Sequence, residues 1–206
     1  MTKRSKKKTM SLLQTQMKER LAMSTVDKVD EANVMIDLET HGVNPGCVIL
    51  SIGATTFAGG VPRVEFYEKI SPVSSRALGF FEDIDTLRWW ARQPKQVYEE
   101  ALSGTKDVEL VLVEFADYLR SVSEQGKKEL RVWGNGADFD LPILAAYYLQ
   151  IGRPIPWKPY SGRCFRTLKN IMPHVILDKR DRTGHHNALG DAKWQAEHAE
   201  LLLNVL

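Results

Sequence analysis

Two carboxylates stand two residues apart at the end of an apolar run in the segment NVMIDLETHG, residues 33–42. If the run is a strand, Asp37 and Glu39 project from the same face, because side chains on a strand alternate with a period of two. Two unpaired carboxylates so close together would repel each other and lose hydration. A divalent cation would neutralise them, and ligation by oxygen alone favours magnesium or manganese. The alternative is that both side chains point into solvent at the strand end.

Three further polar residues stand at the expected ends of elements. Asp140, in VWGNGADFDLPIL, follows a strand and turn at the start of a helix, with Asp138 as a competitor that resembles an N-cap. Asp191, in GHHNALGDAKWQAEHA, lies near the start of the last helix, and His186 precedes it by five residues. Singly, these residues are typical of helix caps, first-turn acids and exposed loops. Together with the first pair, they form a set of four carboxylates and one histidine that is much rarer than its parts.

The elements that must position these side chains follow from the apolar periodicity. The predicted strands are 33–38, 47–57, 64–70, 130–135 and 162–165, and the predicted helices are 84–92, 95–102, 107–122, 140–151, 165–172 and 188–204. The helix over 107–122 begins with the acids Asp107 and Glu109, which we interpret as capping residues. Three close-spaced strands followed by alternating helix and strand indicate an α/β domain with one central sheet.

The charge of the chain is unevenly distributed. Of the 28 Lys and Arg residues, five lie in residues 1–8 without any acid, which leaves 23 cations against 26 acids, a net charge of −3. We therefore predict a basic tail over residues 1–30, disordered or partly helical, and a slightly acidic domain over residues 31–206. The total charge gives no argument for a nucleic-acid partner, because only the tail would supply that attraction.

The remaining composition narrows the cellular setting. Cys47 and Cys164 lie far apart and form no CxxC pair, so we expect no disulfide framework and a cytoplasmic location. No apolar run approaches the ~18 residues that a membrane span needs, and we expect no membrane partner.

The motifs DLETHG, FD and HNALGD resemble the three motifs of the DEDD exonucleases, in the subgroup with a histidine in the last motif. That subgroup includes ribonuclease T and proofreading exonucleases. The fuller pattern is closest to the bacterial and phage 3′-5′ exoribonuclease-like family, over about residues 34–203, through MIDLETHGVNPGCVILSIGATTF, TLRWWARQ, VWGNGADFDLPIL, RCFRTL and HNALGDA. One departure from the wider superfamily is that Asn135 stands one residue further from Asp140 than its motif asparagine would, with Gly136 in that place. The resemblance implies a ribonuclease-H-like fold, a mixed five-stranded sheet flanked by helices.

The resemblance also implies roles for individual residues. It makes the four carboxylates ligands of two divalent ions, Mg²⁺ or Mn²⁺, namely Asp37, Glu39, Asp140 and Asp191. His186 would be the general base, with His185 as the adjacent alternative. The candidate substrate contacts, which the resemblance does not assign, are Leu38, Thr40, Phe139, Trp89 and Trp90. Apart from the resemblance, Arg163 and Arg166 are candidates to contact phosphate, and a surface role fits them equally well.

Trp89 and Trp90 are neighbours on a predicted helix, so their side chains point about 100° apart and cannot both face one pocket fully. We expect at least one to belong to the core and the other to stack on a nucleobase.

The predicted function is a metal-dependent 3′-5′ exonuclease that acts on single-stranded 3′ ends or overhangs of RNA or DNA and releases nucleoside 5′-monophosphates. The alternatives are a non-catalytic nucleic-acid-binding module of the same fold and a hydrolase of very short oligonucleotides. The choice between RNA and DNA stays open, and a homodimer is implied by the resemblance alone.

Overall fold

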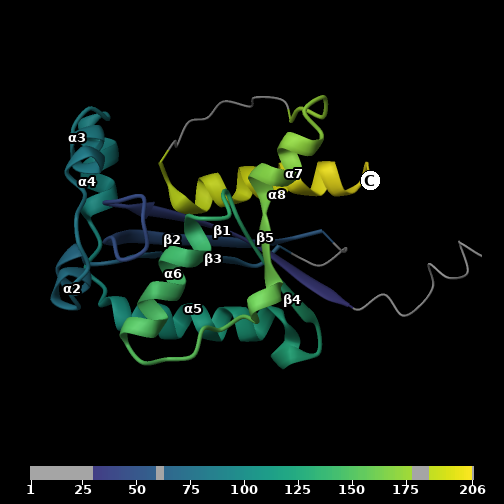
Figure 1. Cartoon of the computed structure of the whole chain (residues 1–206), viewed down its shortest axis with the longest axis horizontal. Coiled ribbons are helices and arrows are strands. Elements are labelled where there is room, and N and C mark those ends of the chain that lie inside the picture. Colours follow the sequence, from purple (N-terminus) through teal and green to yellow (C-terminus); the bar gives the residue numbers. More distant parts are fainter. Residues whose placement is uncertain (1–29, 59–62, 178–185, 206) are drawn as a thin grey trace, which may run out of the picture. The chain divides into compact units, whose positions relative to one another are not determined.

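The computed structural model describes residues 30–58, 63–177 and 186–205. Residues 1–29 of the predicted basic tail lie outside these residues. Within the described chain, five strands form one mixed sheet in the order β3-β2-β1-β4-β5 (Figure 1). The central strand, β1, is Glu31–Thr40, and it therefore has a neighbour on both sides. A strand in this position delivers its carboxyl end to the middle of a sheet edge.

The strands pair as the sequence predicts. The strands β2 (Ile49–Phe57) and β3 (Glu65–Lys69) continue from β1 as an antiparallel meander. The strands β4 (Glu129–Gly134) and β5 (Gly162–Cys164) lie parallel to β1 on its other side. The pairing of β1 with β2 becomes irregular between Glu39 and Thr40, directly beside the first carboxylate pair.

Seven helices are described. Their bounds are α2 (Pro72–Ala77), α3 (Ile84–Trp90), α4 (Lys95–Leu102), α5 (Val108–Val122), α6 (Asp140–Gln150), α7 (Phe165–Ile171) and α8 (Ala188–Leu203), with short 3₁₀ turns η1 (Glu124–Gly126) and η2 (Pro159–Ser161). The predicted strands and helices agree with these bounds to within two residues at each end. Only α2 and the 3₁₀ turns were not predicted, because a single helical turn is too short to show a periodic apolar face.

The predicted caps had different outcomes. Asp107 caps α5, since its carboxylate accepts a hydrogen bond from the backbone N–H of Glu109. The N-cap interpretation of Asp138 is wrong. The N-cap of α6 is Phe139, whose backbone turns at φ −116° and ψ −91° and whose side chain makes no capping bond. The helix thus begins one residue later than Asp138 would need.

The two faces of the sheet carry two apolar clusters, and Figure 1 shows α8 on one side of the sheet with α5 and α6 on the other. Val34 and Ile36 of β1 pack with residues of α5 and α6. Met35 lies in the opposite cluster, together with alanines of α8. Since side chains on β1 alternate, Asp37 and Glu39 share the face of Met35, and α8 covers that face. The small alanine side chains allow this helix to lie close to the sheet.

Candidate active site

Three carboxylates meet where α8 begins over the sheet. Asp37 and Glu39 from β1 and Asp191 from the first turn of α8 each offer an oxygen, and these oxygens lie within 4.8 Å of one another. The close approach depends on Gly53, which pairs with Asp37 on β2. A Cβ at Gly53 would lie 2.2 Å from the carbonyl carbon of Ala188, so any larger residue would push the start of α8 away.

Asp140, the fourth predicted carboxylate, is fully buried in the first turn of α6. Its Oδ2 accepts a 2.8 Å hydrogen bond from the backbone N–H of Asn135, whereas its Oδ1 makes no hydrogen bond within the described part of the chain. The group of three within 4.8 Å does not include Asp140. Its charge nevertheless acts on both Asp37 and Glu39. The structure therefore brings all four acids into one electrostatic unit, although Asp140 lies outside the group of three whose oxygens are within 4.8 Å.

Burial disfavours the ionised form of three of these acids, Asp37, Glu39 and Asp140. It raises the pKa of Asp37 well above its usual range, and the charges of Asp140, Glu39 and Asp191 raise it further. The pKa of Glu39 rises to about 8, first through burial and then through Asp191 and Asp140. Burial also raises the pKa of Asp140 to about 7, against the lowering effect of the Asn135 N–H. Full ionisation at neutral pH needs a compensating positive charge, so the donor set and its buried, unpaired oxygen fit a divalent cation.

Gln195 is a site residue that sequence reasoning missed. Its Nε2 donates a 2.6 Å hydrogen bond to Oδ1 of Asp37, and the side chain is buried. Gln195 follows Asp191 by four residues on α8, so both side chains lie on the same helix face. That spacing was visible in the sequence, but nothing local indicated that the face would meet β1.

His186 stands at the entrance to α8, two residues before the helix begins, with a left-handed backbone at φ 67°. Asn187 caps the helix through Gly190 and also donates a 3.0 Å hydrogen bond to the Tyr67 hydroxyl. The His186 ring packs edge-on against Trp89, with ring centroids 4.7 Å apart. The alternative base, His185, lies outside the described residues.

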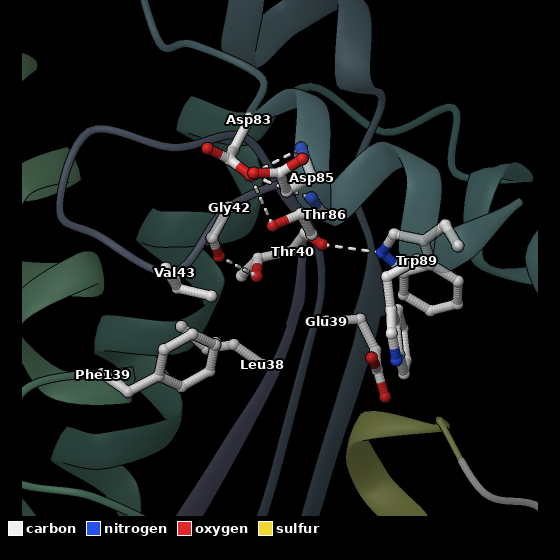
Figure 2. A pocket seen from close by; sticks show the side chains of 11 residues that line it. Leu38, Glu39, Thr40, Gly42, Val43, Asp83, Asp85, Thr86, Trp89 and Phe139 are labelled. Atoms are coloured by element: carbon white, nitrogen blue, oxygen red, sulfur yellow. Dashed lines mark hydrogen bonds between the residues drawn. The ribbon is translucent and has the colours of Figure 1, made fainter.

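A cavity of about 540 Å³ opens beside the carboxylates (Figure 2). All five predicted substrate contacts line it, as does Glu39, together with Gly42, Val43, Asp83, Asp85 and Thr86, which the sequence reading did not single out. Leu38 and Phe139 lie on one side of the cavity and Trp89 on the other, with Glu39 between them. The cavity thus has two apolar walls and a carboxylate of the acidic group at its base.

The two tryptophans divide as expected. Trp90 is buried, donates a 2.8 Å hydrogen bond from Nε1 to the carbonyl oxygen of Thr40, and stacks on Tyr98. Trp89 is 39% exposed and presents its ring to the cavity. Trp90 therefore belongs to the core of this region, and Trp89 offers a surface for stacking.

The family of the chain is decided by its match to a family model. Residues 32–203 match the model of the 3′-5′ exoribonuclease Rv2179c-like domain. The chain belongs to this family. The resemblance carried by the sequence motifs is thereby confirmed, and so is the predicted enzyme class, since the Rv2179c-like family is one of 3′-5′ exoribonucleases. No curated protein sequence matches the chain significantly.

Solved structures with similar folds support the predicted fold class. The nuclease domain of 3′hExo, a DEDDh family member bound to rAMP, has a TM-score of 0.58 and 12% identity, over 87% of this chain and 95% of that one. Escherichia coli Exonuclease I in complex with a dA16 oligonucleotide has a TM-score of 0.55 and 15% identity, over 85% of this chain and 41% of that one. A full-length 3′-exonuclease has a TM-score of 0.55 and 13% identity, over 86% and 84%. At these identities the likeness shows the fold, and the predicted ribonuclease-H-like class is confirmed.

No helix among the described residues is both long and apolar enough to cross a membrane.

Proposed function

We propose that this member of the Rv2179c-like family is a metal-dependent 3′-5′ exonuclease that releases nucleoside 5′-monophosphates from single-stranded 3′ ends. One observation carries the proposal: Glu39 belongs to the group of three carboxylates and also lines the apolar-walled cavity. A nucleotide seated in that cavity would have its phosphate beside the acids. The neighbouring fold of the 3′hExo nuclease domain, bound to rAMP, supports a nucleotide as the occupant.

The acids that would hold two divalent ions, Mg²⁺ or Mn²⁺, are Asp37, Glu39, Asp140 and Asp191. When bound, such ions stabilise the attacking and departing oxygens of an in-line displacement at phosphorus. The chain supplies the oxygen set, in which Glu39 and Asp140 are buried and Asp37 and Asp191 are half-buried. Gln195 holds the orientation of Asp37. Because the metal-free acids favour protonation, binding of the ions would release protons.

The chain's remaining groups bind the end of the strand and move a proton. Leu38 and Phe139 would hold one side of the terminal nucleotide, Trp89 would stack on the other, and Thr40 would border the sugar. His186 turns from Trp89 and accepts the proton of the attacking water at a ring nitrogen. As the water oxygen bonds to phosphorus, the bond to the 3′ oxygen of the preceding nucleotide breaks. That oxygen takes up a proton from solvent and becomes the new 3′ end.

The test uses 5′-labelled RNA and DNA of identical sequence, each with a free or a bulky blocked 3′ hydroxyl. We expect stepwise shortening of the free ends in the presence of Mg²⁺ or Mn²⁺, none with a chelator, and none of the blocked ends. Asp37→Ala should abolish shortening while the protein stays folded. Cleavage of a closed circular single strand, or full activity of Asp37→Ala, would overturn the proposal. The two labelled substrates also decide between RNA and DNA.

The proposal extends to the cellular location and the oligomeric state of the enzyme. We propose a cytoplasmic location, in keeping with the free thiols of Cys47 and Cys164. We also propose a homodimer, which sedimentation of the purified chain would test.

A further inference from the structure

A second cavity of about 380 Å³ lies beside the acidic site, next to Asp140. It forms where the loop after β4, the start of α6, η2 and β5 meet, and its lining includes Gly136, Leu141, Trp157 and Arg163. None of the residues that line it also lines the cavity beside Glu39. The two cavities are therefore separate.

Three consecutive residues connect the first cavity, the acids and the second cavity. Phe139 lines the first cavity, Asp140 acts on the acidic group, and Leu141 lines the second cavity. Because these three residues are consecutive, the start of α6 joins the two cavities, and the buried Asp140 stands in the chain between a lining residue of each. A strand whose scissile phosphate lies at the acids would have the released nucleotide on one side and the preceding nucleotide on the other.

The charges of the lining residues indicate which cavity receives the 3′ end of the strand. The described lining of the first cavity contains Glu39, Asp83 and Asp85 and no lysine or arginine. One of these acids, Asp85, is paired with Arg88 at 3.0 Å. Glu39 belongs to the acids that would hold the ions, which leaves Asp83 as the acid without a cationic partner in that lining. The acids of the first cavity would repel the phosphates of a strand that continued through it. A terminal nucleotide carries no phosphate beyond its own and avoids this repulsion. The first cavity therefore suits a 3′ end.

The segment that supplies most of the lining of the second cavity is basic. Residues 141–177 contain no Asp or Glu, although the chain beyond residue 8 has an excess of acids. The same stretch has five cationic residues, which are Arg153, Lys158, Arg163, Arg166 and Lys169. Arg163 lines the second cavity, and its Nη1 is held by the carbonyl oxygens of Tyr160 and Gly162 at 2.7 and 2.9 Å.

Arg166 lies between the second cavity and the acids. A Cβ built on Gly136, a lining residue of that cavity, would lie 3.7 Å from its guanidinium, and its charge acts on Asp140. Trp157 is half-buried in the wall of the cavity, edge-on to Tyr148, so its ring is held in place. An indole and a guanidinium in one cavity, with a second guanidinium near its Gly136 edge, form a combination that suits single-stranded nucleic acid.

We propose that the second cavity binds the nucleotides that precede the scissile phosphate, with Trp157 stacking on a base and Arg163 and Arg166 contacting phosphates. This inference rests on the proposed exonuclease function. It makes the enzyme one that gains affinity from the length of a single strand on the 5′ side of the cut. It also assigns the polarity of digestion to the contrast between an acidic and a basic cavity.

The test compares two substrates under saturating Mn²⁺. A 5′-labelled 12-nucleotide single strand occupies both cavities, whereas the p-nitrophenyl ester of thymidine 5′-monophosphate offers a terminal nucleotide and no preceding one. We expect Arg163→Ala/Arg166→Ala to raise KM for the 12-mer about ten times more than KM for the ester. The logarithmic salt dependence of 12-mer affinity should also become shallower by about 1.4, at roughly 0.7 for each lost phosphate contact on a single strand. Trp157→Leu should weaken binding of the 12-mer without changing the salt dependence of its affinity.

Arg120→Ala is the matched control, because Arg120 is an exposed arginine of α5 paired only with Asp117 in the described residues. It should leave both KM values and the salt slope unchanged. Arg163→Lys/Arg166→Lys should restore most of the salt slope, and thermal unfolding checks that each variant is folded. Equal KM changes for both substrates, or an unchanged salt slope in the alanine variant, would overturn the proposed nucleotide binding by the second cavity. The proposed exonuclease function would still stand. A wild-type enzyme that cleaves neither substrate would overturn the proposed function itself.

Discussion

Gln195 donates a 2.6 Å hydrogen bond from Nε2 to Oδ1 of Asp37, and the two residues are 158 positions apart in the sequence. The bond joins the helix that supplies Asp191 to the strand that supplies Asp37 and Glu39. It lowers the pKa of Asp37, against the larger effect of burial. It also leaves one fixed direction for the remaining carboxylate oxygen. Gln195 is therefore a positioning residue for the acidic group.

Gln195→Ala should weaken divalent metal binding about 10–100-fold, as expected when a partner that orients a metal ligand is lost. Titration of the purified protein with Mn²⁺, followed by electron paramagnetic resonance, measures this directly and without substrate. Gln150→Ala is the matched control, because Gln150 also donates from Nε2, but to the carbonyl oxygen of Leu78 at the exposed end of α6. Equal metal affinity in the wild type and Gln195→Ala would contradict the positioning role.

Glu39→Gln should stabilise the metal-free protein at alkaline pH. The folded-state pKa of Glu39 is about 8, above the ordinary value of 4.5, so the folded protein holds this proton more tightly than the unfolded chain. The free energy of unfolding must then fall as pH rises from about 4.5 to about 8. Removing the ionisable group should recover roughly 1–3 kcal/mol at pH 8, at about 1.4 kcal/mol per pKa unit and less for groups that share protons.

Urea unfolding of both proteins with a chelator, at pH 5 and at pH 8, checks this expectation. At pH 5 the two should differ little, since Glu39 is protonated in the folded state. Added Mn²⁺ should reverse the order at pH 8, because only the wild type keeps all its ligands. A variant less stable than the wild type at pH 8 without metal would show that burial and the neighbouring acids do not disfavour the charge of Glu39.

His186→Ala should lower kcat about 10²–10⁴-fold, the usual contribution of a general base. Metal binding should be largely kept, since His186 is not part of the acidic group. His185→Ala should cost far less. The acidic limb of the pH–rate profile should vanish in His186→Ala, because an ordinary histidine accepts protons near pH 6.5. A larger loss of kcat in His185→Ala than in His186→Ala, under saturating metal and substrate, would make His185 the general base.

The adjacent tryptophans should respond differently to removal. Trp89→Ala should raise KM by an amount equivalent to roughly 1–3 kcal/mol of base stacking, with little change in the free energy of unfolding. Trp90→Ala should lower the free energy of unfolding by about 3–5 kcal/mol, because it empties a buried site and leaves the Thr40 carbonyl oxygen without its donor. Steady-state kinetics and urea unfolding of both variants separate the two effects. Matching stability losses would mean that Trp89 is also a core residue.

Much of this protein follows from local pattern. The alternation of β1 places Asp37 and Glu39 on one face, whatever covers it, and the apolar periodicity locates the strands and the longer helices. The caps are less certain from sequence. Asp107 caps α5 as predicted, whereas Asp138 does not cap α6, because the backbone angles of Phe139 move the helix start by one residue. Local chemistry allowed either residue, and only the path of the chain chose between them.

The tertiary structure decided what depends on distant segments. The partner of Asp37, the separation of Asp140 from the other three acids, and the choice of Trp89 as the exposed ring all arise where elements far apart in sequence pack together. The second cavity likewise needs α6, η2 and β5 in their places. Side-chain types and spacing determine which groups can bind a metal or a base. Their distances and burial are set by packing, as when the missing side chain of Gly53 lets α8 reach the sheet, and no local pattern encodes that approach.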